Sequence, residues 1–190
     1  MSLSFLGSSL RLRSMSVYQY KNFIPEIGKD CYLAPGAQII GRVKLGNDVS
    51  IWFNTVVRGD VDDVTVGEMT NIQDLSMLHV TNKFPLNIGS RVTVGHKVTL
   101  HGCNIGDNCL IGMGALIMDG ASIGHHSLVA AGSLITPGKT FPPYSFIKGS
   151  PARAERELTE EERQLFGNHY KSYLINKKTY LRDGIIKKIL

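Results

Sequence analysis

Apolar residues recur every six positions along residues 27–147 of this chain. An α-helix places its apolar residues three or four positions apart, whereas a strict period of six suits short strands joined by tight corners. Insertions of three and four residues and one shortening interrupt the repeat without ending it. The twenty positions in this register are Ile27, Leu33, Ile39, Leu45, Ile51, Val57, Val66, Ile72, Leu78, Ile88, Val94, Leu100, Ile105, Ile111, Ile117, Ile123, Val129, Ile135, Phe141 and Ile147.

Each six-residue unit predicts one flat side of a triangular prism, and three units predict one coil. Twenty units divided by three give between six and seven coils. The interior of the prism would hold the stacked apolar side chains. The alternative, an ordinary β-sandwich, would show alternation broken by turns at irregular spacings of about 8 to 12 residues. The sequence therefore predicts an all-β solenoid of hexapeptide repeats.

The pattern changes beyond Pro151, where helix-forming residues replace the repeat. Thr159 stands three residues before Glu162, which is the spacing of a capping box at a helix start. We therefore predict an N-terminal tail over 1–19, a β-helix domain over 20–153 and an α-helical segment over 154–190. The basic residues of the last segment are predicted to form a solvated face; they are Lys171, Lys177, Lys178, Arg182, Lys187 and Lys188.

Composition adds limits on compartment and partners. The chain of 190 residues is 43% hydrophobic and 19% charged, with a formal net charge of +5. It has no run of 18 apolar residues, so we expect no membrane span. Because its net charge is modest, we expect no nucleic-acid partner. The three cysteines are odd in number and form no C-x-x-C pair, which argues against a disulfide framework and a thiolate zinc site. A reducing compartment, the cytoplasm, fits this composition.

The first sixteen residues leave the compartment open. They contain Arg11, Arg13, six serines and no acidic residue, a composition compatible with a transit peptide. A mitochondrial matrix location follows if they are one. The alternative is a loosely packed tail, with Met15 as an internal start.

Three histidines are brought near one another by the predicted prism. Counting the units in threes places Arg58, His79 and His101 in one column on successive coils. Neighbouring strands lie about 4.7–4.9 Å apart, so His79 and His101 are close enough to share one ion. His96 falls on a different side, stacked on Asp74. An equivalent His96 from a neighbouring prism would complete the set, which predicts a metal site at the interface of a closed oligomer with threefold symmetry.

The chemistry of such a site follows from its ligands. Three neutral imidazoles with no fourth protein ligand are typical of a catalytic zinc site with an open position for water. Asp74 is available to orient an imidazole. The ligands do not decide between Zn²⁺, Fe²⁺ and Co²⁺. Stacked histidines with a purely structural role are the alternative.

Several motifs resemble those of the γ-class carbonic anhydrase family, in particular its smaller bacterial and mitochondrial members. The resemblance covers roughly residues 20–160 and rests on "VVRGDV", which ends at Val61, and on three further segments. These are "TNIQDLSMLHV" (70–80), "VTVGHKVTLHGCNIGDNCLIGMGALIMDGA" (92–121) and "GSPAR" (149–153).

This resemblance implies a left-handed parallel β-helix, a homotrimer and a metal bound by His79 and His101 of one subunit and His96 of the next. It implies hydration of carbon dioxide to bicarbonate by a metal-bound hydroxide. It also assigns Arg58 and Asp60 to an ion pair between subunits, Gln73 to a hydrogen bond with the hydroxide, and Asp74 to ordering of the interface and site.

The chain departs from the family pattern where protons are expected to move. Val61 stands where archetypal members carry a glutamate, and the segment "VTNKFPLN" (80–87) replaces an acidic loop. Leu75 occupies a place where many relatives have a smaller or polar residue. Hydration of carbon dioxide requires export of a proton, so we expect slower turnover with metal binding intact. His169 or Tyr170 could replace the proton shuttle, although helix packing is the favoured interpretation of both. His125 and His126 are predicted to be exposed at a corner of a later coil.

Two other functions remain open. An acyltransferase of the hexapeptide-repeat superfamily would use one histidine as a general base and bind coenzyme A between prisms. It would not need the stacked pair. A non-catalytic trimeric scaffold would keep the metal site without activity, and the missing proton shuttle favours this possibility.

Overall fold

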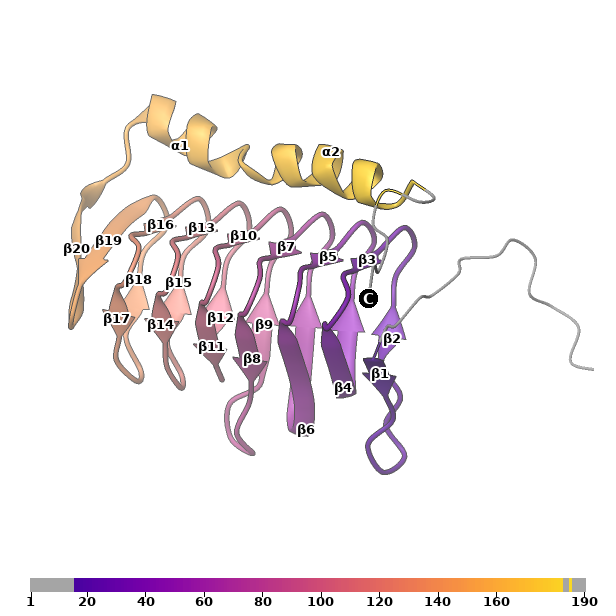
Figure 1. Ribbon diagram of the computed structural model, residues 1–190. Coiled ribbons are helices and arrows are strands. Elements are labelled where there is room, and N and C mark those ends of the chain that lie inside the picture. The colour runs from indigo at the N-terminus through magenta and orange to yellow at the C-terminus, as the bar shows by residue number, and fades with distance from the viewer. Residues whose placement is uncertain (1–15, 183–184, 186–190) are drawn as a thin grey trace, which may run out of the picture.

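The computed structural model describes residues 16–182 and residue 185. They form a parallel β-helix of about seven turns, which is followed by a helical segment (Figure 1). Successive coils stack along one axis, and the strands of each face pair in parallel with those one coil away. The predicted solenoid of hexapeptide repeats is therefore confirmed. No helix among the described residues is long and apolar enough to cross a membrane.

Two faces of the prism belong to one sheet of twelve strands because β4 (Gln38–Leu45) and β6 (Val56–Val66) continue around the corner between them. The other strands of this sheet are β1 (Ser16–Tyr18), β2 (Glu26–Ile27), β8 (Met77–His79), β9 (Leu86–Ile88), β11 (Thr99–His101), β12 (Asn104–Ile105), β14 (Leu116–Ile117), β15 (Ser122–Ile123), β17 (Leu134–Ile135) and β18 (Thr140–Phe141).

The third face is a sheet of eight strands. Its members are β3 (Tyr32–Leu33), β5 (Ser50–Ile51), β7 (Asn71–Ile72), β10 (Thr93–Val94), β13 (Leu110–Ile111), β16 (Leu128–Val129), β19 (Ser145–Gly149) and β20 (Ala152–Glu157). Only β20 runs antiparallel, against β19. Strand β20 thus spans the boundary expected after residue 153, and β1 lies within the expected tail.

The core consists of the predicted apolar column. All of its positions except Ile27 are buried, and most are completely inaccessible to solvent. Burying one such side chain contributes about 1.5–3 kcal/mol. Ile27 is 39% exposed because β2 lies at the N-terminal rim and pairs only with β4. The fold is therefore stabilised by its interior, independently of any bound group.

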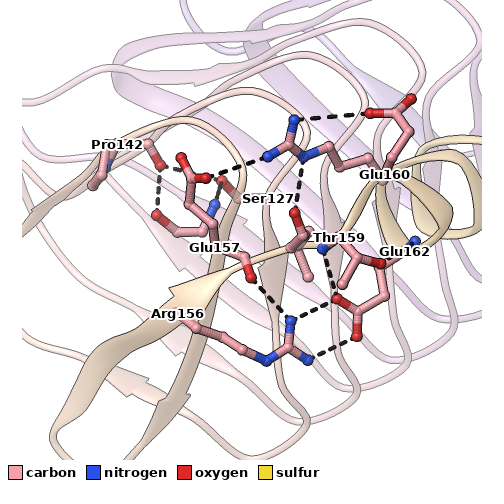
Figure 2. Close-up of polar contacts among 10 residues, drawn as sticks. Ser127, Pro142, Arg156, Glu157, Thr159, Glu160 and Glu162 are labelled. Atoms are coloured by element: carbon pink, nitrogen blue, oxygen red, sulfur yellow. Dashed lines mark hydrogen bonds and ion pairs between the residues drawn. The ribbon is translucent and has the colours of Figure 1, made fainter.

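Two helices follow β20 and lie along one side of the solenoid (Figure 1). Helix α1 (Glu160–Gly167) begins with the predicted capping box, in which Thr159 Oγ1 accepts the Glu162 N–H at 3.3 Å. The Glu162 carboxylate accepts the Thr159 N–H at 2.9 Å and two N–H groups of Arg156 at 2.6 and 2.7 Å (Figure 2). The hydrogen bonds from Arg156 lower the pKa of Glu162 to about 2.

Helix α2 (Tyr170–Tyr180) corrects the expectation of a solvated basic face. Lys177 is only 1% exposed, and its ammonium group donates to the Asp30 carbonyl oxygen at 2.8 Å and to the Asp48 carboxylate. The helix packs on β5, where Tyr180 lies 5.1 Å from Trp52 between ring centroids, so a lysine on this side must be buried. The described basic residues Lys171, Lys178 and Arg182 are exposed as expected, and Lys187 and Lys188 lie outside the described residues.

The proposed transit peptide cannot be compared with the structure because 1–15 lie outside the described residues. The compartment, cytoplasm or mitochondrial matrix, therefore stays a prediction.

Candidate metal site

The predicted histidine column is present at the end of two paired strands. His79 on β8 stands in register with His101 on β11, and Arg58 on β6 precedes them by one coil. Nδ1 of His79 faces Nε2 of His101 at 3.0 Å. The two side chains are 18% and 34% exposed, so the pair is partly shielded yet reachable from solvent.

The outer nitrogen of each ring is held by a carboxylate. His79 Nε2 lies 2.9 Å from Asp60 Oδ1, and His101 Nδ1 lies 2.5 Å from Asp119 Oδ1. An ionised carboxylate only accepts hydrogen bonds, so in neutral imidazoles these outer nitrogens carry the protons. The nitrogens that face each other are then both unprotonated.

Two unprotonated nitrogens 3.0 Å apart direct their lone pairs at each other, an arrangement that favours a cation between them. The residues present therefore fit a divalent metal ion of the kind that imidazole binds. Within the described residues of one chain, however, no three His, Cys, Asp or Glu side chains are grouped so that they could hold a metal ion.

His96, the third predicted ligand, contacts a carboxylate of its own chain. It follows β10, on another face of the prism, and its Nδ1 lies 2.8 Å from Asp74 Oδ2. The predicted stacking of His96 on Asp74 is therefore confirmed. By the same argument, Asp74 leaves Nε2 of His96 unprotonated and available.

Arg58 and Asp60 pair with each other within one chain. Burial is the largest single influence on the Asp60 carboxyl and raises its pKa, but the hydrogen bonds from His79 and Arg58 together lower the pKa below its ordinary value. Asp60 is thereby kept ionised as an acceptor for His79. The ion pair between subunits stays a prediction.

Gln73 lies buried directly after β7, on the face that carries His96. Its amide nitrogen donates to Asn71 Oδ1 at 3.2 Å, and the Asn71 amide donates to Thr93 Oγ1 at 2.9 Å. This network fixes the orientation of the side-chain amides of Gln73 and Asn71. Asn71 was not singled out in the sequence, although its position two residues before Gln73, on the same side of an extended strand, is a usable signal.

Asp119 was also missed. His101 is one residue beyond the inward-facing Leu100, whereas Asp119 is two residues beyond Ile117 on the next coil. The two positions are diagonal neighbours, so strict column counting does not align them. Their contact depends on a corner at Gly102, where the chain turns with φ of +53°.

Two other sequence-selected positions, Val61 and Leu75, directly follow the site residues Asp60 and Asp74. Val61 is 47% exposed and Leu75 is 54% exposed. His169 precedes α2 and packs 5.9 Å from the Tyr173 ring, next to Tyr170. The exposure predicted for His125 and His126 is wrong: both are half-buried because Tyr144 packs against their rings. All three cysteines are buried and free.

Comparison with known proteins gives the family of the chain. The family model described as "Bacterial transferase hexapeptide (six repeats)" matches residues 25–59 and 102–137. A protein from Methanocaldococcus jannaschii named "Probable carbonic anhydrase" is 54% identical over 72% of this chain and 86% of its own length. "Gamma carbonic anhydrase 2, mitochondrial" from Arabidopsis thaliana is 40% identical over 79% of this chain, which spans 56% of that protein.

Among solved structures, a hexapeptide transferase family protein from Anaplasma phagocytophilum aligns with a TM-score of 0.83 and 39% identity. The alignment covers 87% of this chain and 98% of that one. The stacked histidines, the hexapeptide coils and these relatives together lead to one conclusion: the chain belongs to the γ-class carbonic anhydrase family.

Proposed function

We propose that this protein catalyses the reversible hydration of carbon dioxide to bicarbonate at a metal held by His79 and His101 of one subunit and His96 of its neighbour. The observation that supports this most directly is the pair of imidazole nitrogens that face each other at 3.0 Å, while a carboxylate holds the other nitrogen of each ring. The names of the relatives agree with this reaction.

The surface around His96 supports assembly as a homotrimer. Leu75, Met77 and Met113 are among the large apolar side chains that are exposed. Leu75 directly follows Asp74, and the N–H of Gly114, next to Met113, donates to the His96 carbonyl oxygen at 2.9 Å. Exposed apolar groups beside an incomplete set of ligands favour an interface at which His96 meets the pair on another subunit.

Each residue of the site has a separate task in this proposal. When bound, Zn²⁺, Fe²⁺ or Co²⁺ would supply Lewis acidity that makes water nucleophilic near neutral pH. The carboxylates of Asp60, Asp119 and Asp74 hold the outer imidazole protons, and Arg58 keeps Asp60 in place. Gln73 would orient the attacking water with a neutral amide that does not compete for the metal.

Proton export distinguishes this chain from archetypal family members. Val61 and the segment 80–87 offer no acidic group, so we propose that buffer takes up the proton directly. The rate should then rise with buffer concentration and with pH through about 7. A rate independent of buffer would instead require an internal shuttle, and His169 and Tyr170 would be the first residues to replace.

The proposal is tested by metal analysis of anaerobically purified protein together with stopped-flow measurement of carbon dioxide hydration. Light scattering on the same sample reports the oligomeric state. A metal-loaded trimer that hydrates carbon dioxide supports the proposal. A stable monomer with full metal content would contradict the shared site.

A second candidate function is a non-catalytic trimeric scaffold, favoured by the apolar Val61 and the absence of acidic residues in 80–87. It predicts full metal content without hydration at any buffer concentration. Acetyl transfer from coenzyme A, the third possibility, would overturn both and is measured on the same preparation.

A further inference from the structure

The four-residue insertion between Leu78 and Ile88 folds into a tight turn beside the histidine pair. The Thr81 N–H donates to the Phe84 carbonyl oxygen at 3.3 Å, and the Phe84 N–H donates to Thr81 Oγ1 at 3.2 Å. These bonds fix the backbone of Phe84. Its side chain is 41% exposed.

Phe84 lies on two glycines that directly follow site residues. Gly102 follows His101, and a Cβ there would lie 2.9 Å from Phe84 Cβ and 2.9 Å from Asp119 Oδ1. Gly120 follows Asp119, and a Cβ there would lie 3.0 Å from Phe84 Cε1. A side chain at Gly102 would collide with the Cβ and carbonyl oxygen of Phe84, and one at Gly120 would press on its ring, so the two glycines leave the space in which Phe84 lies.

The backbone beneath the ring joins the two coils of the site. The Gly102 N–H donates to the His79 carbonyl oxygen at 3.0 Å, and the Gly120 N–H donates to the Gly102 carbonyl oxygen at 2.7 Å. Phe84 thus lies over the backbone hydrogen bonds that link His79, Gly102 and Gly120. The Asp119 side chain is only 32% exposed beside it.

We propose that Phe84 is a positioning residue of the metal site: seated on Gly102 and Gly120, its ring holds Asp119 against His101 and limits the access of water to that hydrogen bond. The inference rests on the proposed function, because it concerns the binding of a metal by His101. Excluding water lowers the local dielectric and strengthens a charge-assisted hydrogen bond. The insertion would then support the site through an apolar contact and not through an acidic side chain.

The test measures release of Co²⁺ from the loaded full-length protein into excess chelator, followed by the visible absorption of bound Co²⁺. We expect Phe84→Ala to release Co²⁺ about 10-fold faster, and Asp119→Asn about 10- to 100-fold faster, as found when outer contacts of metal-bound histidines are removed. Phe84→Leu restores an apolar side chain and should stay within about threefold of the wild type. Lys83→Ala, in the same turn and exposed, is the matched control and should have no effect.

The outcomes separate the inference from the proposed function. Equal release by Phe84→Ala and the wild type would overturn the role of Phe84 while leaving the metal site intact. Wild-type protein that gives no Co²⁺ absorption would overturn both. If Phe84→Ala and Phe84→Leu release Co²⁺ equally fast and their Tm values fall together, the ring acts through general stability, and the positioning role is overturned. Thermal unfolding of the four variants measures this.

Discussion

The solenoid contains two pairs of facing histidines, and only one has the surroundings of a metal site. His79 and His101 come from adjacent coils, and each donates its outer N–H to a carboxylate. His125 and His126 are neighbours in sequence, with their Nδ1 atoms 2.9 Å apart. Among the described residues, neither of this second pair has an ion pair with a carboxylate.

The second pair instead contacts an aromatic ring that makes a cation–π contact with an arginine. Tyr144 lies 5.1 Å from the His125 ring and 5.6 Å from the His126 ring, and the Arg163 guanidinium stacks 4.1 Å over Tyr144. With no carboxylate to take a proton, one Nδ1 must donate to the other. Closeness of two imidazoles is therefore not enough; the outer acceptors decide whether two lone pairs converge.

The strongest test of this comparison is removal of each ligand in turn. We expect His79→Ala, His96→Ala and His101→Ala each to lose most of the bound metal, because two remaining imidazoles hold a divalent ion poorly. Metal content per subunit by elemental analysis measures the loss. His125→Ala is the matched control and should retain full metal content.

These variants should also keep the β-helix, since its buried apolar column and not the ion supplies the core. Circular dichroism and thermal unfolding measure this. Unfolding of all three ligand variants would instead make the metal structural.

A second prediction separates holding the metal from orienting water. Gln73→Ala should keep metal and trimer but lower the hydration rate by on the order of 10-fold or more, the scale of a lost positioning contact. The Gln73 amide donates to Asn71, so Asn71→Ala should lower the rate in the same direction but less. Loss of metal in Gln73→Ala would contradict its assignment to the water.

Much of this arrangement could be predicted from sequence because the repeat converts spacing into position. A period of six placed His79 on His101 and His96 on Asp74, and both contacts are present. The interior column was equally predictable, since each apolar position repeats the same environment. The exception, Ile27, lies at the rim, where a neighbour on one side is missing.

What could not be predicted depends on departures from the repeat. Asp119 reaches His101 diagonally, through a corner that turns at a glycine, and Phe84 lies in an insertion that has no counterpart on other coils. Lys177 is buried through a contact with Asp48, 129 residues away, which no periodicity encodes. Contacts between subunits are equally outside the repeat of one chain.

A third prediction concerns the pair without carboxylates. Burial, followed by the neighbouring His125, lowers the pKa of His126 below its ordinary value of 6.5. A histidine whose folded pKa is depressed binds protons more readily in the unfolded chain, so stability falls as pH drops below about 6.5. His126→Asn should reduce this acid sensitivity, and asparagine tolerates the positive φ of 54° at this position.

The measurement is Tm as a function of pH between about 8 and 5 for both proteins. Over this range the Tm of the wild type should fall by up to about 4 °C more than the Tm of His126→Asn, since about 1 kcal/mol shifts Tm by that much in a protein of this size. Other groups facing His126 are Asp107, Arg91, Arg163 and His125. Identical slopes would mean that these neighbours, and not His126, set the acid sensitivity.

The smallest expected effect concerns the thiol that lies near each histidine pair. Cys103 is close enough to Asp119 to sense its charge, and Cys109 is influenced by the backbone of His126. Burial raises the pKa of both thiols to about 12, so at pH 8 only about one in ten thousand is the reactive thiolate. We therefore expect neither thiol to ligate metal, and Cys103→Ala to keep full metal content. A thiol reagent at pH 8 should leave both cysteines of the native protein unlabelled, while the same protein in guanidinium labels completely. Rapid labelling of Cys103 that stops on addition of metal would place a thiolate beside His101 and would make the first histidine pair a mixed sulfur and nitrogen site.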